Sequence, residues 1–194
     1  MKIRNILTLC AAVVMMCSLQ SCNYNSIVEQ QNGVDQSWAE VENQYQRRLD
    51  LIPNLVNTVK GYATHESQTL ENVTKARAAA TSITLDPANL NEATLAKYQQ
   101  VQGELSSALK SLLAVTEAYP DLKANENFRD LQAQLEGTEN RIATARSRYT
   151  EAVNTYNVTI KKFPTNIYAS WFGFSPKPQF KAETGAERAP EVKF

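Results

Sequence analysis

The sequence predicts an all-α protein, specifically an antiparallel up-and-down four-helix bundle with long helices and an aromatic C-terminal tail. Two observations predict this fold class. Glycine contributes only 6 and proline only 7 of the 194 residues, so the chain has few residues that favour turns. Prolines bound three long stretches, 54–86, 88–119 and 121–163, that contain no further proline. In each stretch the apolar residues recur every three or four positions, which is the period of an amphipathic helix.

Residues 1–21 are predicted to be a signal peptide rather than part of the bundle. Lys2 and Arg4 precede an apolar run from Ile6 to Cys17. A helix of this length spans about 18 Å, which is less than the ~30 Å hydrocarbon core of a bilayer. A short segment that is first basic and then apolar is typical of a secretory signal.

The apolar run leads into Leu19-Gln20-Ser21-Cys22, which resembles the cleavage site of a bacterial lipoprotein signal. The resemblance implies that the Cys22 thiol is acylated, as by palmitate, and that cleavage makes Cys22 the first residue. The alternative is an uncleaved membrane anchor formed by a helix from Ile3 to Leu19. Both interpretations tether the domain to a membrane. The signal interpretation also places it outside the cytoplasm, on the periplasmic side, because the basic residues stay inside.

The charge and cysteine content of the mature chain exclude several classes of protein. Cleavage before Cys22 removes Lys2 and Arg4 and leaves 18 basic against 20 acidic residues. A protein held to nucleic acid by charge would show a basic excess, so no nucleic-acid partner is expected. Cys10 and Cys17 leave with the signal, so the mature fold would have no disulfide and no thiolate metal site.

Helices are predicted over residues 25–49 and 51–82 at the start of the domain. Apolar residues follow a heptad rhythm up to Tyr45, and Arg48 interrupts it. Arg47 and Arg48 suit the last turn of a helix, where cations are favourable, and Pro53 suits the first turn of the next one. The alternative is a single helix that runs through Pro53, because the apolar rhythm continues after it.

Two further helices are predicted, one ending at Tyr119 and one that begins after Asn125 as its cap. In the last helix one position is apolar or aromatic every seven residues: Phe128, Leu135, Ile142, Tyr149, Tyr156 and Phe163. Four glycines fall one in each helix, at Gly33, Gly61, Gly103 and Gly137. A mid-helix glycine is unfavourable, and close approach of neighbouring helices is its usual compensation, so we expect close packing at these positions.

The bundle is predicted to span residues 22–163, and residues 164–194 to form a short helix and an extended aromatic tail. Residues 166–172 can form this helix, with Gly173 closing it. The expected role of the aromatic side chains is to cover an end or a groove of the bundle. The alternative is an exposed patch for a partner or a membrane surface, because large apolar patches usually mark binding. Phe194, at the terminus, is the ring least expected to be buried.

No catalytic, metal or cofactor site is predicted. The single histidine, His65, excludes a two-histidine metal site and has no nucleophile arrangement around it. The pairs Arg47-Arg48 and Lys161-Lys162 are expected to be solvated helix ends that could also contact acidic headgroups. Two polar blocks are the remaining candidates for a site: Asp50-x-x-x-Asn54 and Glu136-x-x-Glu139-Asn140-Arg141. Their expected role is polar pairing between helices that fixes the register of the bundle.

Long ordered blocks of the chain, together covering about residues 24–194, match a known family. The blocks are Tyr24-Asn25-Ser26, Val34-Asp35-x-x-Trp38, 47–56, 59–66, Ala76-Arg77-Ala78, 117–128, 135–142, Tyr156-Asn157, Phe163-Pro164, Phe172-Gly173-Phe174 and Val192-Lys193-Phe194. On these residues the sequence resembles the LemA family of bacterial membrane-associated proteins. The resemblance implies a helical bundle behind an N-terminal membrane segment, and it implies no particular reaction.

The function expected from these observations is that of a membrane-anchored interaction or scaffold protein of the cell envelope, without enzymatic activity or cofactor. It would be held to the membrane through lipidated Cys22 or an N-terminal anchor, and it would bind an envelope protein. Neither that partner nor an oligomeric state follows from the sequence. The alternative function is a ligand-binding or enzymatic bundle whose site lies among the polar blocks.

Overall fold

The computed structural model describes the backbone of residues 2–63 and 65–181, and the side chains of residues 24–63, 65–87 and 89–181. Over these residues the chain is helical and contains no β-strand. The elements are α1 (Lys2–Lys60), α2 (Ser67–Thr81), η1 (Pro87–Asn89), α3 (Glu92–Val115), η2 (Thr116–Ala118), α4 (Pro120–Ala124), α5 (Glu126–Lys161) and α6 (Thr165–Ala169). The predicted all-α class is therefore confirmed.

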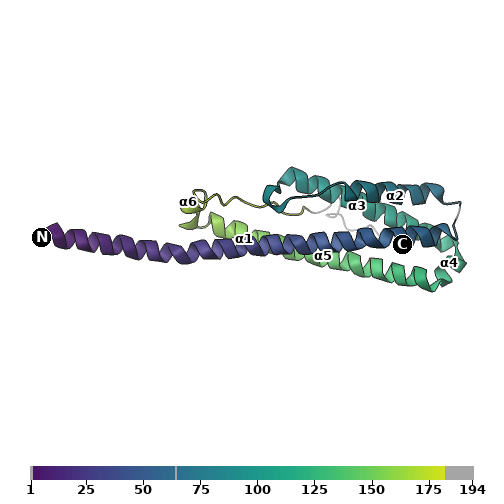
Figure 1. Cartoon of the computed structure of the whole chain (residues 1–194), viewed down its shortest axis with the longest axis horizontal. Helices are drawn as coiled ribbons and strands as arrows, with labels where there is room; N and C mark the ends of the chain where they lie inside the picture. The colour runs from purple at the N-terminus through teal and green to yellow at the C-terminus, as the bar shows by residue number, and fades with distance from the viewer. Residues whose placement is uncertain (1, 64, 182–194) are drawn as a thin grey trace, which may run out of the picture.

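The four longer helices lie along a common direction (Figure 1). Helix α1 packs against α5, and α2 packs against α3. Helix α4 lies at one end of the molecule, and α6 lies at the other end, where the N-terminal part of α1 continues beyond the remaining helices (Figure 1). Among the described residues, no helix combines the length and the apolar character needed to cross a membrane.

The predicted break near Pro53 is wrong, because α1 continues without interruption to Lys60. Pro53 has no N–H to donate to the carbonyl of Leu49 one turn earlier. That carbonyl instead accepts a hydrogen bond of 3.1 Å from Nε of Arg77 in α2. A neighbouring helix thus supplies the missing donor, and the chain turns only after α1 ends at Lys60. The predicted helix over 51–82 is consequently divided between the end of α1 and α2.

The heptad pattern correctly predicted the buried faces of α1 and α5. Trp38 and Tyr149 are each 1% exposed, and the positions that share their helix faces are buried with them. The pattern fails at Phe163, which is 81% exposed, because α5 ends at Lys161. The predicted cap is confirmed, since the Asn125 side chain accepts a 3.0 Å hydrogen bond from the backbone N–H of Phe128.

The prediction of close helix packing is wrong at all four glycines. A Cβ added at Gly33 or Gly103 would meet no atom within 4 Å. At Gly137 the nearest atom would be an Arg141 nitrogen at 3.7 Å, an ordinary contact with a flexible side chain. Gly61 lies just after the end of α1, where a Cβ would lie 3.4 Å from the Thr58 carbonyl of its own helix end. None of the four marks a close approach between helices.

The buried apolar residues form two cores along the length of the molecule. The N-terminal core joins α1, α3, α5 and α6 and contains Ile27, Val34, Trp38, Val41, Tyr45, Leu95, Tyr98, Ile142, Ala145, Tyr149, Val153, Tyr156, Ile160 and Ala169. The α4-side core is formed by the five helices α1, α2, α3, α4 and α5. It contains Leu49, Ile52, Leu55, Val59, Ala63, Leu70, Val73, Ala80, Leu105, Leu109, Leu112, Leu122, Phe128 and Leu135. Because α2 has only 15 residues, it contributes to the α4-side core alone.

Candidate functional site

A buried arginine lies between the two cores. Arg48 of α1 is 1% exposed, and it separates Tyr45 of the N-terminal core from Leu49 of the α4-side core. The prediction that Arg48 occupies the last turn of a helix is wrong, because α1 continues for three more turns. The interruption of the apolar pattern at this position instead marks a polar layer inside the molecule.

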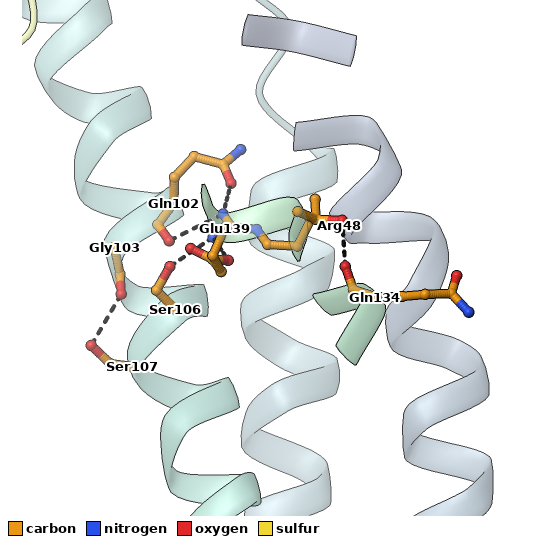
Figure 2. A network of polar contacts seen from close by, with 8 residues as sticks. Arg48, Gln102, Gly103, Ser106, Ser107, Gln134 and Glu139 are labelled. Carbon is orange, nitrogen blue, oxygen red and sulfur yellow. Dashed lines mark hydrogen bonds and ion pairs between the residues drawn. The ribbon is translucent and has the colours of Figure 1, made fainter. Parts of the chain in front are cut away.

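The guanidinium of Arg48 is bound by side chains from two other helices (Figure 2). Its Nη1 donates to the hydroxyl of Ser106 at 2.6 Å and to a carboxylate oxygen of Glu139 at 2.8 Å. Its Nη2 donates to the side-chain oxygen of Gln102 and, at 3.3 Å, to the Gln102 backbone carbonyl. Gln102 and Ser106 belong to α3 and Glu139 to α5. We refer to Arg48, Gln102, Ser106 and Glu139 as the Arg48 layer.

The Arg48 layer resembles a structural contact more than a reacting centre. A buried guanidinium needs acceptors for its donors, and three helices supply them at one level. The guanidinium also lies 5.1 Å from the centroid of the Tyr45 ring. Sliding any one of α1, α3 or α5 along its axis would separate the charge from its acceptors. The layer therefore favours a single axial register of these helices, although its net free energy of pairing is modest.

Burial also shifts the acidity of groups beside this layer. Burial raises the pKa of the Tyr98 phenol well above its usual value, and nearby Tyr45 and Glu42 act in the same direction. Burial likewise raises the pKa of the Glu42 carboxyl. These two pKa shifts do not indicate a catalytic pair, because neither of them involves a base next to a nucleophile. Among the described residues, no group of three or more His, Cys, Asp or Glu side chains is placed to hold a metal ion.

A small polar cavity of about 170 Å³ lies beside the Arg48 layer, between α3 and α5. Besides the layer itself, its lining includes Lys110 and Arg146. The Nε of Arg48 is buried and has no hydrogen-bond partner within the described part of the chain. A small polar molecule in this cavity would lie beside the buried charge of Arg48.

Of the two candidate polar blocks, only Glu139 contacts a buried residue. Glu139 contacts Arg48 as the predicted pairing between helices requires, whereas Glu136, Asn140 and Arg141 are exposed. Asp50 and Asn54 are also exposed, and Asp50 accepts a 2.8 Å hydrogen bond from Gln46 on its own helix. The structure thus does not bring the two predicted blocks together.

Gln102 and Ser106 were not predicted from the sequence. Gln102 lies on the apolar face of α3 between Tyr98 and Leu105, both of which are buried. The signal in the sequence was a polar residue at a position where the apolar pattern of the helix expects an apolar one. Arg48 gives the same signal in α1. Arg77 was not predicted either. No local pattern indicates its role, because its acceptor is the Leu49 carbonyl that Pro53 leaves without a donor.

The other predicted residues lie apart from this layer. His65 is exposed in the turn after α1, and Lys161 and Lys162 are exposed at the end of α5. Cys22 lies within α1, but its side chain and the whole of residues 182–194, with Phe194, fall outside what the structure describes.

The aromatic tail divides into a packed part and an exposed part. Phe180 stacks on Trp38 with ring centroids 6.1 Å apart and meets Tyr149 edge-on at 5.4 Å. The hydroxyl of Tyr149 donates a 3.0 Å hydrogen bond to the carbonyl of Pro178. By contrast Trp171 is 80% exposed. The expected covering of a groove applies to Phe180, and the alternative of an exposed patch applies to the residues around Trp171.

One asparagine fixes the backbone of the packed part. Asn157 of α5 donates to the carbonyl of Lys177 at 2.8 Å and accepts from its N–H at 2.9 Å. Gln99 of α3 donates to the carbonyl of Lys181 at 2.6 Å. We refer to residues 175–181 as the strap. It completes the N-terminal core alongside α1, α3 and α5, at the level that α2 does not reach.

These features define an all-helical protein with two cores, a buried polar layer between them and a C-terminal strap. The model of the LemA family matches residues 37–194. The chain therefore belongs to the LemA family, as the sequence blocks indicated, and the matched range begins at Ser37 rather than near Tyr24.

Curated relatives match parts of the chain. It is 34% identical over 85 residues to magnetosome protein MamQ 2 of Paramagnetospirillum magneticum, which covers 44% of this chain and 31% of that protein. It is 33% identical over 72 residues to magnetosome protein MamQ of Magnetospirillum gryphiswaldense, which covers 37% and 26% respectively. It is 24% identical over 148 residues to protein LemA of Metamycoplasma hominis, which covers 76% and 60%. The matches thus span about a third or less of the length of the MamQ relatives.

Proposed function

We propose that this LemA-family protein is a membrane-anchored scaffold of the cell envelope, without catalytic activity, whose helical body binds another envelope protein. We further propose that α1, α2, α3 and α5 act as an antiparallel bundle, because all four contribute to the α4-side core. The anchor is the acylated thiol of Cys22, on the extracytoplasmic side. The resemblance of the sequence to membrane-associated proteins and to a lipoprotein signal supports this anchor.

The observation that carries the proposal is the continuity of α1. The helix that contains Cys22 also contains Ile27 and, further on, Val59, which are both fully buried in the two cores. The five residues from Cys22 to Ile27 rise about 8 Å along a helix. An acyl chain on Cys22 would therefore hold the body close to the bilayer, with no flexible linker between them. A rigid, close attachment suits a protein that presents its surface to a membrane-bound partner.

The anchor is tested by labelling growing cells with an alkyne-bearing fatty acid. We expect label on the intact chain and on Cys17→Ala, because Cys17 leaves with the signal, and none on Cys22→Ala. Label retained in Cys22→Ala would contradict acylation at this residue. Absence of label on the intact chain would do the same and would favour the uncleaved anchor.

The partner is tested by crosslinking in cells, followed by affinity purification and mass spectrometry of the intact chain and Cys22→Ala. A discrete envelope protein that is crosslinked to the intact chain and is lost or reduced in Cys22→Ala supports the scaffold. Equal recovery of the same proteins from both forms would contradict a role for the anchor. The absence of a specific protein from both would contradict the scaffold itself.

A second candidate function is binding of a small anion in the cavity beside Arg48. The observation that favours it is the positive charge of the cavity lining. The lining contains three basic side chains, Arg48, Lys110 and Arg146, and one carboxylate, that of Glu139. Thermal unfolding with added inorganic phosphate tests it. A rise in Tm that Lys110→Gln abolishes would support binding, and an unchanged Tm would exclude phosphate. The scaffold is preferred because Glu139, Ser106 and Gln102 already occupy both terminal nitrogens of Arg48.

A further inference from the structure

An exposed apolar patch surrounds the end of α5 and the short helix α6. Phe163, Ile167, Trp171 and Phe172 are 81%, 49%, 80% and 60% exposed, and we refer to these four as the aromatic patch. Residues 163–176 contain no charged side chain. Lys161 and Lys162 directly precede the patch and are exposed as well. Large rings left in water next to a basic pair call for a partner surface that is apolar and anionic.

The patch lies beside the start of the helical body. The ring of Tyr24 in α1 meets Phe172 edge-on with centroids 5.1 Å apart, and it lies 5.6 Å from the ring of Phe174. Cys22 precedes Tyr24 by two residues in the same helix, a rise of about 3 Å. Figure 1 shows α6 at the end of the molecule from which α1 continues toward its N-terminus.

We propose that the aromatic patch is a lipid-contacting surface that seats this end of the body in the headgroup region of the bilayer. The proposal rests on the anchor of the proposed function and goes beyond it, because it assigns the orientation of the body on the membrane. Tryptophan is enriched at the boundary between headgroups and hydrocarbon, where its ring is buried and its N–H stays hydrated. The two lysines would meet the phosphates of anionic lipids.

The position of the patch favours lipid over a protein as its occupant. An acyl chain on Cys22 would bring the bilayer to the level of Tyr24, and an uncleaved helix that ended at Leu19 would do so within a further turn or two. In either arrangement the anchor brings the bilayer to the end of the molecule at which the rings around Trp171 are exposed. A second contact of this kind adds to the attachment that the acylated Cys22 provides.

The two tryptophans of the chain provide the test. Trp171 is 80% exposed in the patch, whereas Trp38 is 1% exposed in the N-terminal core and serves as the matched control. The full chain and Trp171→Phe are isolated from cell membranes and reconstituted into vesicles of phosphatidylcholine and phosphatidylglycerol, with and without brominated phosphatidylcholine. The emission of Trp171 is obtained by subtracting the emission of Trp171→Phe from that of the full chain. Both proteins keep Trp38, so the core is the same in the two.

We expect a loss of Trp171 emission in brominated lipid, because bromine on an acyl chain quenches an indole ring that contacts it, and no change for Trp38. We also expect Trp171 to be protected from acrylamide in plain vesicles. Trp171 that remains fully accessible to acrylamide, in protein that floats with the vesicles, would overturn the patch while leaving the anchor in place. Protection without quenching by brominated lipid would also overturn it and indicate a second copy or another protein on the patch. Protein that does not float with the vesicles would refute the anchor, and the proposed patch would fail with it.

Discussion

At the scale of single residues, the Arg48 layer concentrates the largest predicted effects on stability. Arg48→Ala leaves Glu139, Gln102 and Ser106 without their common donor and creates a cavity between the two cores. We expect a loss of about 3–5 kcal/mol in the free energy of unfolding. Glu139→Gln keeps one acceptor on a side chain that is 41% exposed, and we expect a smaller loss of about 1–2 kcal/mol.

Arg141→Ala is the matched control, because Arg141 lies two residues beyond Glu139 on a different face of α5 and is exposed. Its expected effect is within about 0.5 kcal/mol. Urea denaturation followed by circular dichroism measures all three variants. If Arg48→Ala were as stable as Arg141→Ala, the layer would not hold the helices in register, and its role would have to be sought in the adjoining cavity.

A second pair of residues explains why α1 passes through Pro53. Arg77→Ala removes the donor to the Leu49 carbonyl, and we expect it to cost about 1–2 kcal/mol. In a Pro53→Ala background the restored N–H of residue 53 supplies that carbonyl. The cost of Arg77→Ala should then fall by half or more. A double-mutant cycle from urea denaturation measures this coupling, and equal costs in the two backgrounds would refute the explanation.

At the scale of elements, replacing a mid-helix glycine that has open space around it should stabilise the helix. Nothing lies within 4 Å of a Cβ built on Gly33, so Gly33→Ala should raise the free energy of unfolding by about 0.5–1 kcal/mol. Gly173 has a φ of +79°, and Gly173→Ala should instead lower it by about 1 kcal/mol. Thermal melts compare the two. A destabilised Gly33→Ala would mean that the helices do pack closely there.

The strap is held to α5 by the two hydrogen bonds between the Asn157 side chain and the backbone of Lys177. Asn157→Ala removes both hydrogen bonds to Lys177, and we expect the strap to detach about tenfold more often. Tryptic cleavage after Lys181 should accelerate by the same factor. Asn154→Ala, one turn earlier and exposed, is the control and should be cleaved at the original rate. Equal rates for both variants would show that other contacts, such as Phe180 on Trp38, hold the strap alone.

At the scale of the whole molecule, the sequence predicted the features that depend on local spacing. The helical class, the buried faces around Trp38 and Tyr149 and the Asn125 cap all follow from residues within a few turns of one another. Features set by distant residues were missed. The acceptors of Arg48 lie 54 to 91 positions away along the chain, and the donor that lets α1 continue past Pro53 lies 28 positions from its acceptor.

The candidate site shows the same division. The interruption at Arg48 was visible in the sequence, but a charged residue in an apolar stripe is compatible with a helix end as well as with a buried layer. Only the packing of α3 and α5 distinguishes the two. The sequence also did not decide between two roles for the aromatic tail, because an aromatic composition favours both burial and surface binding. In the structure Phe180 and Trp171 divide those roles between them.

The central claim is that the helical body is held rigidly at a membrane through Cys22. The most direct test is the mass of the intact protein isolated from cell membranes. We expect a chain that lacks residues 1–21 and carries acyl groups on Cys22. A chain that still begins at Met1, or one that begins at residue 22 without an acyl group, would contradict it.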